Sequence, residues 1–232
     1  MAQYFNDFEQ YALGSGLPVD WGITNNAGIN FEVTTVSGNR GLAYATNTFF
    51  IHRYFYENRI NALGDIADVD VYVEFLRDRN AATYESNTVE VLVRSDLNNN
   101  HYGLGIYASI VRIRRLNNGG FSTLTEGANL VDGLYSMRVR ANGTFLGVKT
   151  WLKGTDEPVA WSISTTDATH STGRTGFWVR DSTSSAVFQV YGVGTNGDSA
   201  PTSPIVAGPS TPINLSITNL LATSARLNWE QG

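Results

Sequence analysis

The sequence contains no cysteine, so the chain can form no disulfide, no thiolate metal site and no cysteine nucleophile. Disulfides are common in extracellular eukaryotic β-sandwiches, and their absence favours a bacterial or viral source. No apolar run approaches the length of a membrane span. The segment from Met1 to Asp7 lacks the basic and apolar regions of a secretory signal. We therefore expect no membrane insertion, and no signal peptide in the sequence as it stands.

Charge is also scarce. Charged residues make up 16% of the chain, and the net charge of −5 argues against nucleic acid as a partner. Among the 16 basic residues only Lys149 and Lys153 are lysine. Arginine presents a planar fork of donors and stacks on rings, so this bias favours directional polar contacts; genome composition explains it equally well. The histidines, His52, His101 and His170, are scattered and show no transition-metal spacing.

Alternation of apolar and polar residues is the main pattern that is present. It is clearest where Val69, Val71, Val73 and Phe75 share one parity. The same period predicts strands at 88–94, 102–107, 109–116, 135–141, 144–152, 177–179 and 187–193. Asn142-Gly143 predicts a tight hairpin, and only 55–63 suggests a short helical turn. The sequence therefore predicts an all-β fold, an antiparallel two-sheet sandwich with a short C-terminal β extension.

Proline divides the chain. Most of the 6 prolines lie between Pro201 and Pro212, a clustering typical of a stiff linker. We predict a β-sandwich over 1–197, a Pro-rich linker over 198–211 and a separate β segment over 212–232. This last segment resembles the first two strands of a fibronectin type III domain. The residues that carry the resemblance are Pro212, Leu215, Leu220, Ser224, Ala225, Leu227 and Trp229.

Residues 1–197 resemble a concanavalin A-like (laminin G-like) jelly roll of bacterial and phage type. The opening Asp7-Phe8-Glu9 is followed by Trp21, and a late string completes the pattern: Trp151, Gly154, Glu157, Pro158, Trp161, Asp167, Gly173 and Gly176. The resemblance implies glycan binding or adhesion, and some members of this fold are glycoside hydrolases. It also implies calcium as a possible cofactor, with Asp7 and Glu9 at one end of the site and Asn196 or Asp198 at the other.

An enzyme is not expected. Retaining glycosidases need two carboxylates about 5 Å apart, and hydrolases of the resembled fold usually carry them as Glu-x-Asp-x-x-Glu on one strand. No such triplet occurs here. Asp68, Asp70 and Glu74 share one strand face, but the interpretation we favour is a solvated outer face. Trp21 and Trp161 are expected in the core.

A ligand surface is predicted from the same alternation. If the apolar parity points inward, the opposite parity places arginines and aromatic residues on an outer face, where rings stack on sugars and arginines grip hydroxyls or carboxylates. The local excess of basic residues favours an anionic polymer. Ordinary sheet amphipathicity or a subunit interface is the competing interpretation. The predicted ligand-binding residues are Arg94, Tyr107, Arg112, Arg114, Arg138, Arg140, Trp151, Trp178 and Arg180.

These features favour a non-catalytic adhesion or carbohydrate-binding module. The leaderless start favours a phage tail or fibre protein that contacts host cell-surface polysaccharide, alongside other virion subunits and as a homo-oligomer. An architectural virion protein that uses the sandwich and C-terminal strands for assembly is one alternative. An accessory glycan-binding module of a bacterial secreted or surface protein is another. The expected location is therefore the virion or the extracellular space.

Overall fold

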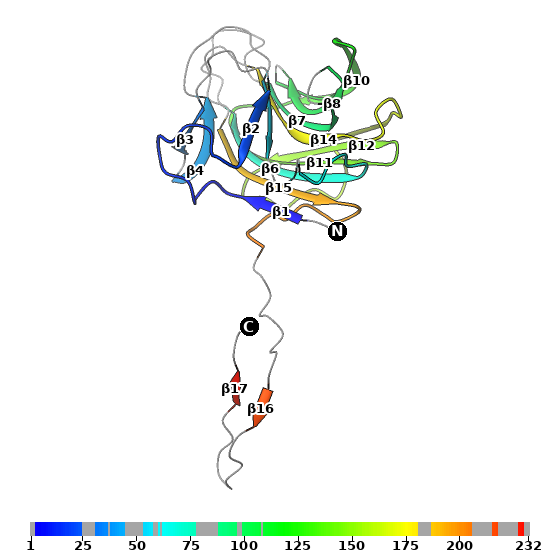
Figure 1. The fold of residues 1–232 in the computed structure, drawn as a ribbon. Helices are drawn as coiled ribbons and strands as arrows, with labels where there is room; N and C mark the ends of the chain where they lie inside the picture. Colours follow the sequence, from blue (N-terminus) through cyan, green and yellow to red (C-terminus); the bar gives the residue numbers. More distant parts are fainter. Residues whose placement is uncertain are drawn as a thin grey trace.

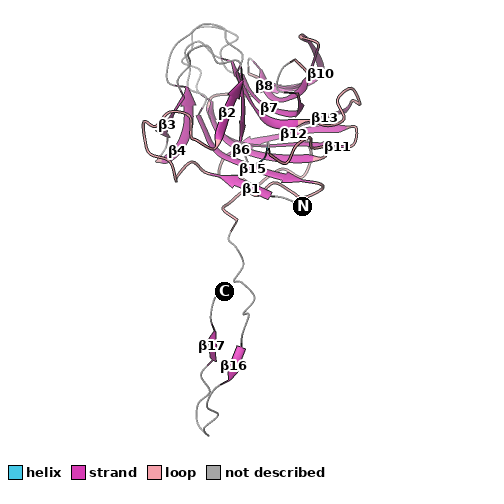
Figure 2. Cartoon of the chain, in the orientation of Figure 1, coloured by secondary structure: helices cyan, strands magenta, loops and turns pink. Residues whose placement is uncertain are grey.

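The computed structural model describes residues 3–24, 31–36, 38–44, 53–57, 60, 62–77, 88–96, 99–107, 109–180, 187–205, 215–217 and 227–229. Figure 1 and Figure 2 show these parts as strands joined by turns. Two antiparallel sheets pack face to face, which confirms the predicted jelly-roll sandwich. Within the described ranges, no helix has the length and apolarity needed to cross a bilayer.

Sheet A has 8 strands, in the order β13-β12-β11-β6-β15-β4-β3, with β1 paired to β15. Its strands are β1 Gln3–Asn6, β3 Phe31–Val36, β4 Asn39–Tyr44, β6 Val69–Arg77, β11 Gly133–Asn142, β12 Phe145–Leu152, β13 Ile163–Thr166 and β15 Val187–Thr195.

Sheet B has 7 strands, in the order β10-β9-β8-β7-β14-β5-β2. Its strands are β2 Trp21–Thr24, β5 Arg53–Glu57, β7 Thr88–Ser95, β8 His101–Tyr107, β9 Ile110–Asn117, β10 Gly120–Asn129 and β14 Arg174–Arg180. The strand β5 occupies part of the 55–63 segment, where a helical turn was expected. That expectation was wrong for 55–57, because pairing with β2 and β14 holds the backbone extended.

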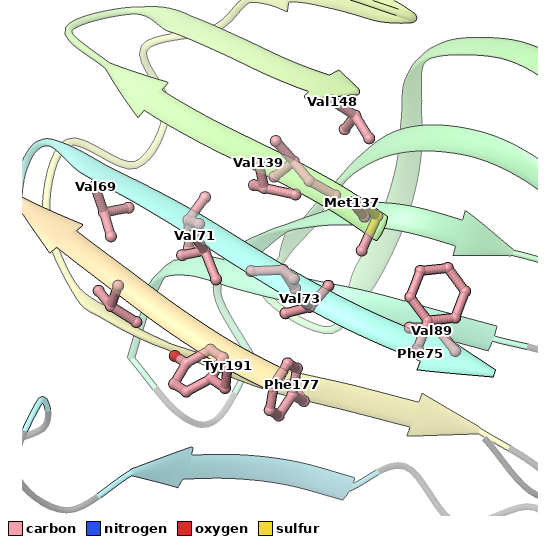
Figure 3. Close-up of a cluster of buried hydrophobic side chains, with 14 of the residues drawn as sticks. Val69, Val71, Val73, Phe75, Val89, Met137, Val139, Val148, Phe177 and Tyr191 are labelled. Atoms are coloured by element: carbon pink, nitrogen blue, oxygen red, sulfur yellow. The ribbon is translucent and has the colours of Figure 1, made fainter. Parts of the chain in front are cut away.

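Inward-facing side chains obey the predicted alternation. Val71, Val73 and Phe75 of β6 are each 0% exposed, and Val69 is 3% exposed. Figure 3 shows them packed with Val89 of β7 and with valines of the neighbouring strands. A one-residue slip would carry this whole row to the solvent side, so burial fixes the register of β6 between β11 and β15.

Aromatic rings fill one end of this core. Phe177 of β14 stacks on Phe188 of β15 at 4.1 Å between ring centroids, and on Trp21 of β2 at 5.6 Å. Tyr191 tilts against both Phe177 and Trp21. Trp21 is 4% exposed, which confirms its predicted place in the core. The cluster ties together sheet A and sheet B, since its members come from both.

The hairpin between β11 and β12 is present, with its turn shifted by one residue. Asn142 pairs with Phe145, so Gly143 and Thr144 form the two-residue loop. Gly143 has a φ of 53°, and a glycine at the first loop position is what a type II′ hairpin turn requires. The hairpin prediction is therefore confirmed, while the residues that make the turn differ from the expected Asn142-Gly143.

The C-terminal segment contains an antiparallel pair, β16 Leu215–Ile217 and β17 Leu227–Trp229. Leu215 is opposite Trp229, and Ile217 is opposite Leu227. Strand pairing at these positions is compatible with a fibronectin type III start, and that identity stays a prediction. The predicted division into 1–197, 198–211 and 212–232 likewise stays a prediction.

We predict that Phe177→Ala lowers the free energy of unfolding by roughly 3–5 kcal/mol, because it leaves a cavity among three packed rings. Urea denaturation followed by tryptophan fluorescence measures this change. Leu152→Ala is the control, since Leu152 is 50% exposed. Its expected effect is below about 0.5 kcal/mol. Equal losses in the two variants would contradict the assignment of Phe177 to the core.

Candidate functional site

The predicted ligand-binding residues do not share one surface. Arg138, Arg140 and Trp151 lie on strands of sheet A, whereas the others lie on strands of sheet B. The outer faces of two packed sheets point in opposite directions, so a single platform of all nine residues is impossible. The backbones of Trp178 and Arg180 pair with Glu90 and Thr88 of β7, and their side chains lie outside the described part of the structure. The two outer faces therefore carry separate sets of the predicted residues.

A buried carboxylate organises the outer face of sheet A. Asp70 is 3% exposed and accepts from Arg138 Nη1 at 2.6 Å and from Arg140 Nε at 2.7 Å. Arg138 Nε also donates to Glu157 at 3.0 Å, and Lys149 Nζ reaches the same carboxylate at 3.1 Å. The expectation that Asp70 and Glu74 lie on a solvated face was wrong: Glu74 is 9% exposed and binds Lys153 Nζ at 2.6 Å.

A strap formed by residues 198–201 covers one side of this face. The Ala200 amide donates to Asp70 at 3.0 Å, and Ala200 is 4% exposed. Gly192 and Gly194 of β15 lie directly beneath the strap, where a β-carbon would collide with the backbone of Pro201 or of residues 198–199. These two glycines are therefore needed for the strap to approach the sheet.

Trp161 covers the other side of the same face. It lies over Gly147 of β12, where a β-carbon would be 2.9 Å from the indole ring. Phe145 meets the ring edge-to-face at 5.4 Å, and Lys149 and Arg140 lie 5.0 and 5.6 Å from its centroid. The expected core position of Trp161 was wrong. The indole packs outside sheet A because a glycine and two cations provide a site for it there.

Trp151 also lies on this outer face, half-buried, with its ring 6.1 Å from that of Tyr72. The Tyr72 hydroxyl donates to Glu74 at 2.7 Å. Burial is the main cause that raises the pKa of Tyr72, and the Glu74 carboxylate also acts to raise it. Sheet A thus carries a second, polar layer of packing on its outside. Of the arginines predicted to bind ligand here, Arg138 is buried and bound to Asp70 and Glu157, and Arg140 is bound to Asp70 with its side chain 37% exposed.

The outer face of sheet B is built on a different ion pair. Glu90 of β7 is 0% exposed, and its two oxygens accept from Arg114 Nε at 2.7 Å and Nη2 at 2.6 Å. A β-carbon on Gly103 would be 2.7 Å from the Glu90 carboxylate, so this glycine provides the space in which it lies. Burial raises the pKa of Glu90, and the charge and hydrogen bonds of Arg114 oppose that shift.

This ion pair fixes Arg114 between two rings. Its guanidinium carbon lies 4.1 Å from the Tyr107 centroid and 4.4 Å from the Phe121 centroid. Phe121 of β10 is 40% exposed and Tyr107 is half-buried. Arg112 pairs with the exposed Glu126 at 3.1 Å. We call Tyr107, Arg112, Arg114 and Phe121 the ring–arginine cluster. Phe121 was not identified from the sequence. The residues from Asn117 to Gly120 indicate a turn, and the sequence predicts no strand directly after it, although β10 begins there.

Arg94 departs from the predicted alternation. Its φ is 52°, a left-handed conformation that breaks the strand pattern near the end of β7. Its side chain is 2% exposed and donates to the carbonyls of Ala67, His170 and Gly143 at 2.6–3.1 Å. Arg94 therefore joins loops of the two sheets instead of facing solvent.

Asp167 fixes the loop that precedes β14. It accepts from the Tyr102 hydroxyl at 2.6 Å, the Thr169 amide at 2.8 Å and Arg115 Nη1 at 2.8 Å. Burial acts to raise its pKa, but these three donors outweigh that effect and lower the pKa from 3.8 to about 2. The ionised carboxylate is therefore part of the folded loop.

The residues predicted to bind calcium are not brought together. Asp7 and Glu9 follow one end of β1, and Glu9 accepts from the Arg40 amide at 2.8 Å. Asp198 lies beyond the other end, where Gln3 pairs with Gly194 and donates to the Ser199 carbonyl. Four residues of strand span about 13 Å, too far for one ion. Among the described residues no cluster of three acidic, histidine or cysteine side chains could hold a metal.

Asp70→Ala should lower the free energy of unfolding by roughly 3–5 kcal/mol, because it leaves two arginines and the Ala200 amide without their buried acceptor. Chemical denaturation provides the measurement. Glu126→Ala is the matched comparison: it breaks an exposed pair with Arg112 and should cost less than about 1 kcal/mol. A mild effect of Asp70→Ala would show that the network does not stabilise the face.

Asp167 predicts a dependence of stability on pH. Since its folded pKa is depressed, its contribution is fully present above pH 3.8 and is lost as pH falls towards 2. Asp167→Asn should remove roughly 2 kcal/mol at neutral pH. The substitution should also weaken the pH dependence of the unfolding free energy between those pH values. Urea titrations across the range measure this dependence. Identical slopes for variant and parent would refute this role.

No protein-family model and no curated protein matches the chain. Solved structures share its fold. The carbohydrate-binding module CBM66 from Bacillus subtilis is 19% identical, with a TM-score of 0.53 over 73% of this chain and 92% of its own. The exoplasmic/lumenal domain of VIP36, bound to Ca2+ and Man3GlcNAc, is 13% identical, with a TM-score of 0.52 over 79% and 86%. The GH43 protein BlXynB from Bacillus licheniformis is 14% identical, with a TM-score of 0.54 over 83% of this chain and 39% of its own. The shared fold is a jelly-roll sandwich, consistent with the predicted concanavalin A-like type.

Proposed function

We propose that the chain is a non-catalytic glycan-binding module and that the ring–arginine cluster on sheet B contacts the sugar. The observation that carries this proposal is the guanidinium of Arg114, clamped by buried Glu90 between Tyr107 and the 40% exposed Phe121. Aromatic surface that is held rigid loses little entropy on binding, and sugars stack on it. Arg114, 5% exposed, acts as a positioning residue, and Phe121, Tyr107 and Arg112 are the groups that meet ligand.

The fold supports the same class of function. CBM66 is named a carbohydrate-binding module and the VIP36 domain is bound to Man3GlcNAc, and both share the sandwich. A shared fold leaves function open, so the surface chemistry must decide. Sheet A is the weaker platform because the strap and Trp161 cover it and Asp70 holds Arg138 and Arg140. The paired arginines also weaken the case for an anionic polymer.

We propose that the module is not an enzyme because of the way in which the Glu90 carboxylate is bound. Both of its carboxylate oxygens are bound by Arg114, which leaves it poorly placed to attack a sugar or transfer a proton. Release of reducing sugar from a polysaccharide panel, lost in Glu90→Gln, would overturn the proposal of a non-catalytic module.

We place this module on a phage tail or fibre that contacts host surface polysaccharide, where it would assemble as a homo-oligomer with other virion subunits. The support is the sequence resemblance to bacterial and phage domains. An architectural virion role remains the first alternative, and an accessory module of a bacterial secreted or surface protein is the second. Particle assembly that fails in variants with normal folding would favour the architectural role.

Glycan-array and whole-cell binding test the proposal directly. Phe121→Ala and Tyr107→Ala should each weaken binding about fivefold or more, because each removes a stacking surface worth roughly 1 kcal/mol. Phe145→Ala on the opposite sheet is the matched control and should bind normally. Repeating the titration with EDTA tests calcium, whose removal should weaken binding if an ion assists. Unchanged binding in both ring variants would place the glycan site elsewhere.

A further inference from the structure

A cavity of about 450 Å³ opens at one end of the sandwich, apart from the ring–arginine cluster. This open cavity is bordered by described residues that follow β7, β9 and β13 and by Asp65, which precedes β6. The polar residues that line it include Asp65, Asp96, Asn117, Thr169, Ser171 and Thr172. Ligand pockets commonly begin at about 300 Å³, so the space suits one or two sugar residues.

The rim of this end cavity is held in place before any ligand arrives. Asp96 accepts from the Asn100 amide at 3.0 Å and from Asn100 Nδ2 at 2.8 Å. Asn100 Oδ1 in turn accepts from the Asn118 amide at 2.9 Å. One asparagine thus links the loop after β7 to the turn after β9. A rim that is already ordered lowers the entropic cost of binding.

The opposite wall is fixed by Arg94 and His170. Arg94 donates to the His170 carbonyl at 3.1 Å, and the His170 amide donates to the Tyr102 hydroxyl at 2.9 Å. His170 Nε2 lies 2.8 Å from the Leu116 carbonyl, which only accepts, so Nε2 carries a proton. The wall therefore depends on partly buried hydrogen bonds within the protein.

The charges of this cavity select against anions. The cation in the lining, Arg94, is 2% exposed, gives hydrogen bonds to three carbonyls and lies 3.7 Å from the Asp68 carboxylate. The exposed carboxylates of Asp65 and Asp96 remain at the surface of the cavity. A ligand with its own carboxylate would meet repulsion from both. Hydroxyl and amine donors would find carboxylate and amide acceptors.

We infer that the end cavity is a second binding site, for a neutral or amine-bearing sugar residue, that works independently of the ring–arginine cluster. It would bind the sugar through carboxylate, amide and hydroxyl groups without ring stacking, which separates it chemically from the first site. A chain with both sites could contact a polysaccharide at two places and gain affinity through multivalency.

The test uses glucose, glucosamine and glucuronate as probes, titrated against the full chain and followed by amide NMR shifts. Saturable shifts of Asn100, Ser171 and Thr172 are expected with glucose and glucosamine. Glucuronate should bind at least tenfold more weakly. Asp65→Asn, at an exposed side chain, should narrow the difference in affinity between glucose and glucuronate severalfold, because it removes one of the two carboxylates that repel glucuronate.

Ser171→Trp fills the cavity and should abolish the shifts of Asn100 and Thr172 with all three probes, whatever binds at the ring–arginine cluster. Ser203→Trp, an equally exposed position outside the cavity, is the control and should bind normally. Phe121→Ala should leave these titrations unchanged, so failure of this inference is distinct from failure of the proposed function. Absence of cavity shifts with glucose and glucosamine, cavity shifts of Asn100 and Thr172 that survive Ser171→Trp, or equal cavity binding of glucuronate would each overturn the inference.

Discussion

The outer face of sheet A depends on the buried carboxylate of Asp70. Two guanidinium groups and one backbone amide converge on it; the Arg138 guanidinium and the Ala200 amide would otherwise be buried polar groups without an acceptor, whereas the Arg140 side chain is 37% exposed. Because Asp70 satisfies all three, the strap can lie on the sheet and exclude solvent. The outer face of sheet A is therefore covered, whereas on sheet B the ring of Phe121 remains exposed.

Sheet B also carries a buried carboxylate paired with arginine on its outer face, but this ion pair has a different role. Glu90 is buried as deeply as Asp70, yet it binds a single arginine, and that arginine supports two rings at the surface. A buried ion pair costs desolvation energy that packing alone would not require. On sheet A the buried ion pairs hold the covering strap in place. On sheet B the buried ion pair holds the arginine that supports exposed aromatic surface. This difference is the physical basis for assigning ligand contact to sheet B.

Strand alternation predicted the antiparallel all-β sandwich, and the burial of Val71, Val73 and Phe75 confirms the predicted parity of β6; the jelly-roll type came from the family resemblance. Alternation could not predict which outer faces are free, since that depends on segments far away in the sequence. The strand glycines carried the missing signal: Gly147, Gly192 and Gly194 each lie where another segment touches the sheet. Arg94 was predicted to lie on the outer face, but its own left-handed backbone conformation turns its side chain away from that face. The residues predicted to bind calcium lie beyond opposite ends of β1, a separation that strand alternation does not indicate.

The strap also determines where the chain leaves the sandwich. The last strand of sheet A ends at Thr195, but the backbone stays attached to that sheet through Ala200 and the Ser199 carbonyl. Tension on residues beyond Pro201 would therefore act first on the bonds between Ala200, Asp70 and Arg138, before it reached the ladder between β6 and β15. Release of these bonds would expose Asp70 and Arg138 on the outer face of sheet A, whereas the hydrophobic core between the two sheets would stay covered.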